Sequence, residues 1–322
     1  MAVSGLFTCR APRWCGVVFF LAVATAYAAD DPKVNLVPER PARAARADLR
    51  AETDLVLVPV SVTDPKNRAV TGLAKDSFRL FDEKAEQRVL HFAEEDGPIS
   101  VGIVFDASRS MAGKLKQARA AVAEFLRNSN PADEYFLVSF NDRAQLAVPF
   151  TNDPGDIQNR LLETGALGRT ALVDAVYLAL DTMRHAAHSR KAVLLVSDGG
   201  DNDSRYSQGE LRRRLRETSV AIYAMGIYER GMLVLPEEER GGPQLLDDLA
   251  EQSGGRHFPV GNLADLTKSA AQIGLELRNQ YVLGYSPEGP LNDGKYHRLQ
   301  VKLVGQGNLR VTSRPGYFAP ER

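Results

Sequence analysis

Two hydrophobic patterns alternate along the central part of this 322-residue chain. Between residues 100 and about 280, uninterrupted apolar runs such as VGIVFD and KAVLLVSD are separated by segments such as KLKQARAAVAEFLRN, whose apolar residues recur every three or four positions. The first pattern is typical of strands buried on both faces of a sheet, and the second of amphipathic helices. Because the two patterns alternate, we expect an α/β domain in which a doubly wound sheet carries helices on both faces.

The segments on either side of this domain have the pattern of half-buried strands. Residues 54–99 contain DLVLVPVSVTD, FRLFDE and RVLHFAEE, and the last forty residues contain QYVLGYSPE, KYHRLQVKLVG and NLRVTSRPGYF. Neither segment has enough strands to close a core alone. We therefore expect the N-terminal and C-terminal segments to join into one small antiparallel β unit that flanks the α/β domain.

The first 29 residues have the features of a secretory signal peptide. Arg10 and Arg13 precede the apolar run CGVVFFLAVATAYA, and the triplet AYA at 26–28 is a small-x-small cleavage sequence. The run is shorter than the ~20 residues that span a bilayer, and no later segment is long and apolar enough to be transmembrane. We interpret the chain as exported, either periplasmic or secreted; an uncleaved anchor is the alternative.

Composition adds two limits to this organisation. Both cysteines, Cys9 and Cys15, lie in the signal, so we expect the exported chain to hold together without disulfides. The 40 basic and 41 acidic residues leave a net charge of −1, which gives no sign of a nucleic-acid-binding surface. The predicted parts are a signal peptide at 1–29, a flexible lead-in at 30–52, an N-terminal β segment at 53–98, the α/β domain at 99–280 and a C-terminal β segment at 281–322.

Polar residues follow the buried strands at the points where these strands end. Asp106 ends one run, and Ser108 and Ser110 lie in the loop that follows it. Asp198 ends a second run, and Thr170 opens a predicted helix between the two. In open α/β sheets, ligands bind outside the carboxyl ends of the strands. We therefore expect two carboxylates and three hydroxyls to converge at one edge of the sheet.

Carboxylate, hydroxyl and water oxygens are the ligands of hard divalent cations such as Mg²⁺, Mn²⁺ and Ca²⁺. Three of the five groups are neutral, so the protein compensates the charge of such a cation only in part. A site of this kind keeps an open position and favours a carboxylate from another molecule. Each Asp or Ser alone could be a helix cap, but their joint occurrence at two strand ends favours a cation site, with Mg²⁺ expected first.

The segments DASRS (106–110), GRT (168–170) and SDGGDN (197–202) resemble the metal-ion-dependent adhesion site (MIDAS) of von Willebrand factor type A domains, whose fold is Rossmann-like. In that family the Asp-x-Ser-x-Ser loop and the Thr coordinate the metal, and the last Asp usually acts through water. The resemblance implies that the metal ligands are Asp106, Ser108, Ser110, Thr170 and Asp198. The flanking segments are similar to those of von Willebrand factor A-related proteins exported by some bacteria.

Two residues near the motif carry separate expectations. Arg109 stands where the family commonly has glycine, and it either pairs with an approaching carboxylate or crowds it. Asp201 is expected to support the metal ligands from behind rather than to bind the cation.

The resemblance implies an exported, non-enzymatic protein that captures an Asp or Glu side chain of a partner protein through a divalent cation. One alternative is a metal-dependent hydrolase or phosphotransferase with Asp106 as nucleophile. That chemistry would need a second Asp two residues on and a lysine near the site; Ser108 occupies the first position, and the sequence nominates no lysine. The other alternative is a structural envelope module with a vestigial metal site.

Overall fold

The computed structural model describes residues 55–127, 129–228, 241–287, 293–305 and 307–319, all within the compact unit Glu52–Arg322. The predicted signal peptide and lead-in lie outside the described residues. Within the described stretches, none of the helices is long and apolar enough to cross a membrane.

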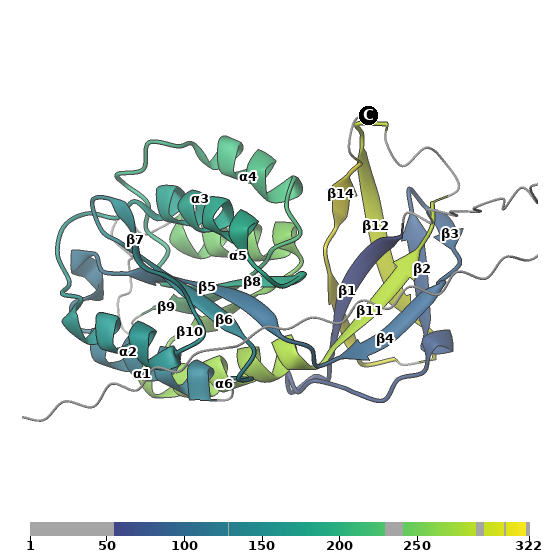
Figure 1. Ribbon diagram of the computed structural model, residues 1–322, viewed down its shortest axis with the longest axis horizontal. Helices are drawn as coiled ribbons and strands as arrows, with labels where there is room; N and C mark the ends of the chain where they lie inside the picture. The colour runs from purple at the N-terminus through teal and green to yellow at the C-terminus, as the bar shows by residue number, and fades with distance from the viewer. Residues whose placement is uncertain (1–54, 128, 229–240, 288–292, 306, 320–322) are drawn as a thin grey trace, which may run out of the picture. The chain divides into compact units, whose positions relative to one another are not determined.

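A six-stranded sheet forms the centre of the α/β domain, with the strand order β10-β9-β8-β5-β6-β7 (Figure 1). Its strands are β5 (Ile99–Asp106), β6 (Glu134–Phe140), β7 (Ala144–Thr151), β8 (Arg190–Ser197), β9 (Ala221–Ile227) and β10 (Arg256–Val260). Neighbouring strands are parallel except for β7, which runs antiparallel to β6. Every residue of β5 is buried, as its uninterrupted apolar run predicts.

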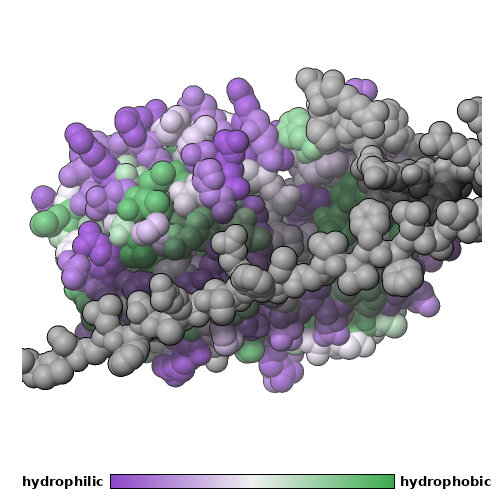
Figure 2. Space-filling view, in the orientation of Figure 1, coloured by the Kyte–Doolittle hydropathy of each residue, from purple (hydrophilic) through white to green (hydrophobic). Residues whose placement is uncertain are grey.

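Helices cover both faces of this sheet, which confirms the predicted α/β fold with a doubly wound sheet (Figure 1). Apolar residues of α1, α2 and α6 pack into one core cluster, and those of α3, α4 and α5 pack into a second. Figure 2 shows hydrophilic side chains over most of the outer helical layer, as amphipathic helices require. The helices are α1 (Leu115–Arg127), α2 (Pro154–Glu163), α3 (Leu172–Thr182), α4 (Gln208–Arg216), α5 (Gly242–Ser253) and α6 (Leu266–Arg278), with single 3-10 turns at η1 (Lys75–Ser77), η2 (Arg109–Met111), η3 (Met183–His185) and η4 (Leu263–Asp265).

Helix α2 is the one helix of the domain that the hydrophobic pattern did not predict. The sequence nevertheless contains residues typical of a helix start. The Asp153 side chain accepts a hydrogen bond from the Gly155 amide at 2.8 Å, and Pro154 occupies the first helical position. Only Ile157 and Leu161 are buried along its length. Two apolar contacts are too few to give a clear helical periodicity.

The flanking segments form two four-stranded antiparallel sheets, ordered β13-β1-β11-β4 and β14-β12-β2-β3. Their strands are β1 (Val56–Thr63), β2 (Phe78–Asp82), β3 (Ala85–Gln87), β4 (His91–Glu95), β11 (Gln280–Tyr285), β12 (Tyr296–Leu303), β13 (Arg310–Ser313) and β14 (Gly316–Phe318). Each sheet contains strands from both ends of the chain, with Val56 opposite Tyr285 in the pairing of β1 with β11. The predicted antiparallel unit built from both segments is therefore present, and we call it the sandwich.

The α/β domain is an insertion between two neighbouring strands of the sandwich. Glu95, the last residue of β4, pairs with Gln280, the first residue of β11. The insertion thus starts and ends at adjacent points, as is usual for inserted domains. The Arg190 guanidinium fastens both connections, because it donates hydrogen bonds to the carbonyls of Gly97 and Leu277.

Asp133 is the second fastening point at this end of the sheet. Its fully buried carboxylate accepts hydrogen bonds from the Ile99 amide at 3.0 Å and from the Tyr135 hydroxyl at 3.0 Å. It also accepts one from the Arg278 guanidinium, at the end of α6. One carboxylate therefore ties the start of β5 to the helix that leads back to the sandwich.

Replacing this carboxylate tests its structural role. Asp133→Ala removes the acceptor of the Ile99 amide and the Tyr135 hydroxyl and a buried charged partner of Arg278, and we expect a loss of about 3–5 kcal/mol in the free energy of unfolding. Urea denaturation followed by circular dichroism measures this loss. The matched control Asp153→Ala removes an exposed helix cap and should cost about 1 kcal/mol. A loss in Asp133→Ala no larger than that of the control would contradict the assignment.

Candidate metal site

The register of two parallel strands brings the first carboxylate to the edge of the sheet. In the pairing of β5 with β8, Phe105 lies opposite Val196, so Asp106 is placed beside Ser197. The Ser197 hydroxyl donates a hydrogen bond to Oδ2 of Asp106 at 2.6 Å, and the Ser108 amide donates one to Oδ1 at 2.8 Å. These two bonds fix the orientation of a carboxylate that is completely buried.

The two serines of the loop after β5 lie side by side. The hydroxyl oxygens of Ser108 and Ser110 are 3.0 Å apart, with Ser108 buried and Ser110 exposed. The loop is held against the segment that precedes Thr170, because the Leu167 amide donates to the Ala107 carbonyl and the Arg109 amide donates to the Gly168 carbonyl. The hydroxyls therefore come from a loop whose backbone is fixed at both sides.

Thr170 is held from the other side by the loop after β8. Its amide donates to the side-chain oxygen of Asn202 at 3.0 Å, and its carbonyl accepts from the amides of Asn202 and Asp203. Gly168, with φ at +80°, lies so close to Asp142 that an added Cβ would be 2.6 Å from that carboxylate. A glycine is required there, and it makes the GRT turn possible.

Asp201 supports the site from the end of helix α3. Its carboxylate accepts hydrogen bonds from the Leu172 and Val173 amides, at 3.0 and 3.2 Å, and from the Ser204 hydroxyl at 2.6 Å. It therefore caps the first turn of α3, the helix that follows Thr170. Its position agrees with the supporting role expected for it.

Asp198 has a partner that the sequence analysis missed. Lys114 lies just before α1, and its ammonium group is 3.0 Å from Oδ2 of Asp198 with both side chains buried. The other carboxylate oxygen of Asp198 is buried and has no hydrogen-bond partner. The expectation that no lysine is near the site was therefore wrong. A lysine at the N-terminal start of a helix interacts unfavourably with the helix dipole. This unfavourable position was the feature of the sequence that could have identified Lys114.

The two carboxylates raise the energy of each other's charged form. Burial, and then the negative charge of Asp198, raise the pKa of Asp106 to about 7, against the hydrogen bonds from its serine neighbours, which lower it. Lys114 compensates one of the two negative charges. The other charge, that of Asp106, has no cationic side chain in contact with it among the described residues.

An open hollow of about 670 Å³ leads from the surface to this edge. It is lined by Arg109, Ser110, Asp142, Gly168, Arg169, Thr170, Asp198, Gly200 and Asn202. Arg109 is exposed on the rim, and the guanidinium of Arg169 pairs with Asp203 at 3.1 Å. The lining thus combines the buried Asp198 and Thr170 with exposed side chains, among them two arginines and the carboxylate of Asp142.

The donor set fits a hard divalent cation. All five residues named from the sequence lie at one edge of the sheet: Asp106 is the last residue of β5, Ser110 is in η2, and the other three are in loops. One buried carboxylate oxygen, Oδ1 of Asp198, lacks a partner. Three of the donors are hydroxyls, which agrees with the finding that no cluster of three or more His, Cys, Asp or Glu side chains suited to a metal occurs among the described residues. Oxygen donors without nitrogen or sulfur are those of Mg²⁺ or Mn²⁺ sites.

Residues 101–200 match the profile of the von Willebrand factor type A domain. The magnesium-chelatase 67 kDa subunit of Chlorobaculum tepidum is 26% identical over 206 residues, which are 58% of this chain and 32% of that subunit. The chain thus matches about a third of the length of this relative.

Two solved structures are similar at low sequence identity. A von Willebrand factor type A protein from Catenulispora acidiphila is 13% identical, with a TM-score of 0.49 over 82% of this chain and 72% of that one. Proximal thread matrix protein 1 from the mussel byssus, with a zinc-occupied MIDAS motif, is 20% identical, with a TM-score of 0.46 over 61% of this chain and 49% of that one. The profile match covers both strand ends that carry the candidate carboxylates, so the part of this chain that resembles a von Willebrand factor type A domain is the part that contains the candidate site.

Proposed function

We propose that this chain is an exported binding protein that captures an acidic side chain of another protein through a divalent cation. The cation would be held by Asp106, Ser108, Ser110, Thr170 and Asp198. The observation that carries the proposal is the convergence of these oxygens at one edge of the sheet. Ser110, Thr170 and Asp198 line an open hollow there, and Ser108 and Asp106 adjoin them through hydrogen bonds. Bound there, the cation would act as a Lewis acid for an incoming carboxylate.

Charge supports an anionic partner. The candidate site has two buried carboxylates, Asp106 and Asp198, and Lys114 already compensates the charge of Asp198. A divalent cation would therefore leave net positive charge, and neutral hydroxyls cannot remove it. An Asp or Glu side chain from outside supplies the missing charge, and Arg109 on the rim attracts the same kind of partner.

Two further features favour binding over catalysis. Asp106, the only candidate nucleophile of the Asp-x-Ser-x-Ser loop, is fully buried, and both of its oxygens already accept hydrogen bonds. Lys114 provides the lysine that phosphoryl transfer would need, but it is buried against Asp198 rather than directed into the hollow. The relative in magnesium chelatase is the observation that keeps an enzymatic role as the second candidate.

Export is proposed from the sequence of residues 1–29. The charged start, the apolar run and the small-x-small triplet are the features of a cleaved signal. Mg²⁺ is the proposed ion because it prefers the same oxygen donors and keeps several waters.

The metal-binding part of the proposal is tested by charge removal. Asp106→Asn keeps the size of the side chain and an acceptor for the Ser108 amide, so we expect the fold to survive. The loss of the charge should weaken Mn²⁺ binding by about 100-fold or more. This exceeds the usual loss of affinity when a residue that only holds a metal ligand in place is mutated. Thr170→Ala should weaken it by about tenfold, because water can replace a neutral ligand.

Isothermal titration with Mn²⁺ and Mg²⁺ measures both effects, and circular dichroism checks the fold. The matched control is Asp156→Asn, which neutralises an exposed carboxylate on α2. If both Asp106→Asn and Thr170→Ala bind Mn²⁺ like the parent chain, the metal site is refuted.

Lys114 provides an independent test through stability. Lys114→Met leaves the buried Asp198 without its cationic partner, and we expect the metal-free chain to lose about 3–5 kcal/mol of unfolding free energy. A divalent cation at the site can supply the missing charge. We therefore expect Mg²⁺ to raise the melting temperature of Lys114→Met more than that of the parent chain.

Differential scanning calorimetry with Mg²⁺ and with EDTA measures this difference. Lys116→Met, which removes an exposed lysine two residues further on, should behave like the parent chain in both conditions. An equal Mg²⁺ effect in all three proteins would contradict the expectation that a bound cation replaces the charge of Lys114 beside Asp198.

Capture experiments test the partner. The purified chain, immobilised and exposed to an envelope extract, should retain a protein in Mg²⁺ that EDTA releases. Immobilised Asp106→Asn should not retain it. Retention that is insensitive to both EDTA and Asp106→Asn would contradict metal-dependent capture, and turnover of a phosphoester by the parent chain would favour the enzymatic alternative.

A further inference from the structure

A second cavity, of about 610 Å³, lies at the opposite edge of the parallel sheet. Its lining includes Ile99, Arg190 and Ala221, where β5, β8 and β9 begin or nearly begin. It is therefore separate from the candidate metal site, which lies at the carboxyl ends of the same strands. Its volume falls in the range of small-molecule sites, roughly 300–1,000 Å³.

One wall of this cavity is the outer face of the sandwich. Along β1, Val56, Val58 and Val60 point into the sandwich core, so the alternate residues Leu57 and Pro59 face the cavity. This face carries apolar side chains that stay partly exposed in the described part of the chain. Leu57 is 46% exposed and Phe318, on β14, is 39% exposed.

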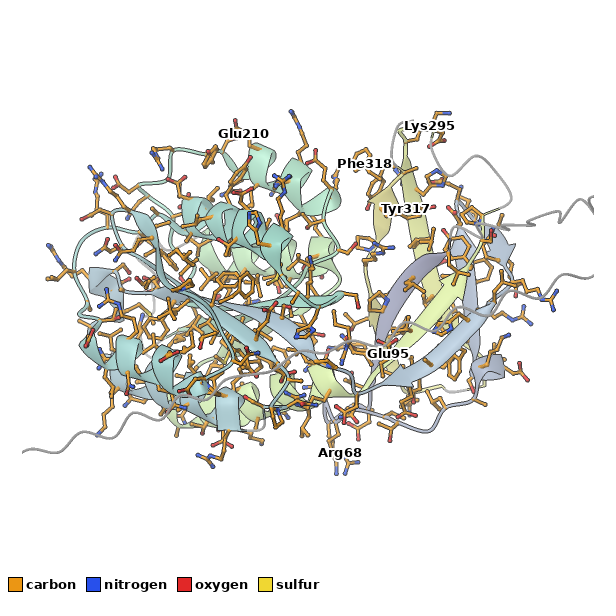
Figure 3. The ribbon with its side chains drawn as sticks, in the orientation of Figure 1. Arg68, Glu95, Glu210, Lys295, Tyr317 and Phe318 are labelled. Carbon is orange, nitrogen blue, oxygen red and sulfur yellow. The ribbon has the colours of Figure 1, made fainter. Side chains whose placement is uncertain are left out.

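Some of these apolar side chains lie directly against the backbone of the neighbouring strand β11. Gly284, on β11, lies under the side chains of Leu55 and Leu57, and an added Cβ at Gly284 would be 2.1 Å from the first of them. Figure 3 shows Phe318 and Glu95 on the strands of the sandwich, and both residues line the cavity. An exposed apolar wall inside a cavity is typical of a ligand site rather than of an ordinary surface.

Arginines provide the polar part of the lining. Arg314 donates hydrogen bonds to the Ser219 hydroxyl at 3.0 Å and to the Leu57 carbonyl at 2.9 Å, while its Nε is buried and has no partner. Arg216 is exposed at the end of α4, and its guanidinium stacks over the Tyr296 ring at 5.6 Å. Burial lowers the pKa of Arg314, which means that its positive charge is held at a cost that an anion in the cavity would reduce.

The acidic residues of the lining do not cancel this charge. Glu95 lies 4.0 Å from Arg190, and Glu217 lies 3.4 Å from Arg214, which is outside the cavity. Arg216 and Arg314 thus remain as two cations beside the apolar wall. A carboxylate beside these two guanidinium groups would offset the cost of holding the Arg314 charge in the wall of the cavity.

We propose that this cavity binds an amphipathic carboxylate, with its hydrocarbon chain on Leu57 and Phe318 and its carboxylate between Arg216 and Arg314. A single negative charge is favoured over a dianionic head group, because Glu95 and Glu217 also line the cavity and would repel a second charge. The proposal does not depend on the metal site.

Titration calorimetry of the purified full chain with decanoate, below its micelle concentration, tests the proposal. We expect saturable binding at one site per chain. Decanol, which has the same hydrocarbon chain without the charge, should bind about tenfold more weakly, and decylammonium should not bind measurably. EDTA and the variant Asp106→Asn should leave the affinity for decanoate unchanged.

Variants distinguish the two parts of the site. Arg216→Gln, at an exposed position that should not affect folding, should weaken decanoate binding about tenfold and leave decanol binding unchanged. Leu57→Gln should weaken both. The matched control Arg213→Gln changes an exposed arginine on the same helix that does not line the cavity, and should have no effect.

The proposal is overturned by any of three results. The first is the absence of saturable decanoate binding. The second is equal affinity for decanoate, decanol and decylammonium, which would indicate a purely hydrophobic surface. The third is an affinity for decanoate that neither Arg216→Gln nor Leu57→Gln changes.

Discussion

The burial of two carboxylates at one edge of a parallel sheet is the constraint on which the site depends. Asp106 and Asp198 follow adjacent strands, and the strand register leaves them no freedom to separate. Like charges in a poorly solvated place are costly, and the raised pKa of Asp106 expresses that cost. Lys114 offsets one charge, hydrogen bonds from Ser108 and Ser197 stabilise the other, and a divalent cation would complete the compensation.

The sandwich closes its core with strands that are distant in the sequence. Strand β4 ends where the α/β domain begins, and its neighbour β11 begins where that domain ends. The inserted domain therefore connects the two halves of the sandwich, and its two ends lie at paired positions of neighbouring strands. Arg190 and Asp133 hold this junction through buried charged hydrogen bonds, which are strong but sensitive to the loss of either partner.

Sequence patterns predicted the layered fold well because long apolar runs and regular helical spacing leave few alternatives. The joined β segments were also predictable, since neither could form a core alone. Helix α2 was missed because it buries only two apolar residues. Its capping residues mark where the helix starts, but the helix lacks the regularly spaced apolar residues that would have indicated it.

The candidate site, like the fold, could be predicted from the sequence only in part. The convergence of the five oxygen-bearing side chains could be predicted, because parallel strands always place their carboxyl ends together. Lys114 could not be placed, because its contact with Asp198 joins residues 84 positions apart and depends on how α1 enters the sheet edge. The cavity at the other edge was also invisible in the sequence. Its wall mixes β1, α4 and β14, and only the tertiary structure brings these elements together.

Strand β8 connects the two edges, since Arg190 begins it and Asp198 follows its last residue. Eight residues of extended chain separate the two side chains by roughly 26 Å. This distance exceeds the Debye length of about 8 Å at physiological ionic strength, so the charges at one edge do not reach the other through solvent. Any influence of a ligand in the cavity on the metal site would have to be mechanical, through a shift of the strand or of the helices packed on it. The fully buried middle of β8 resists such a shift, because closely packed interiors change in discrete steps rather than gradually. The structure therefore favours independent binding at the candidate metal site and at the proposed carboxylate site.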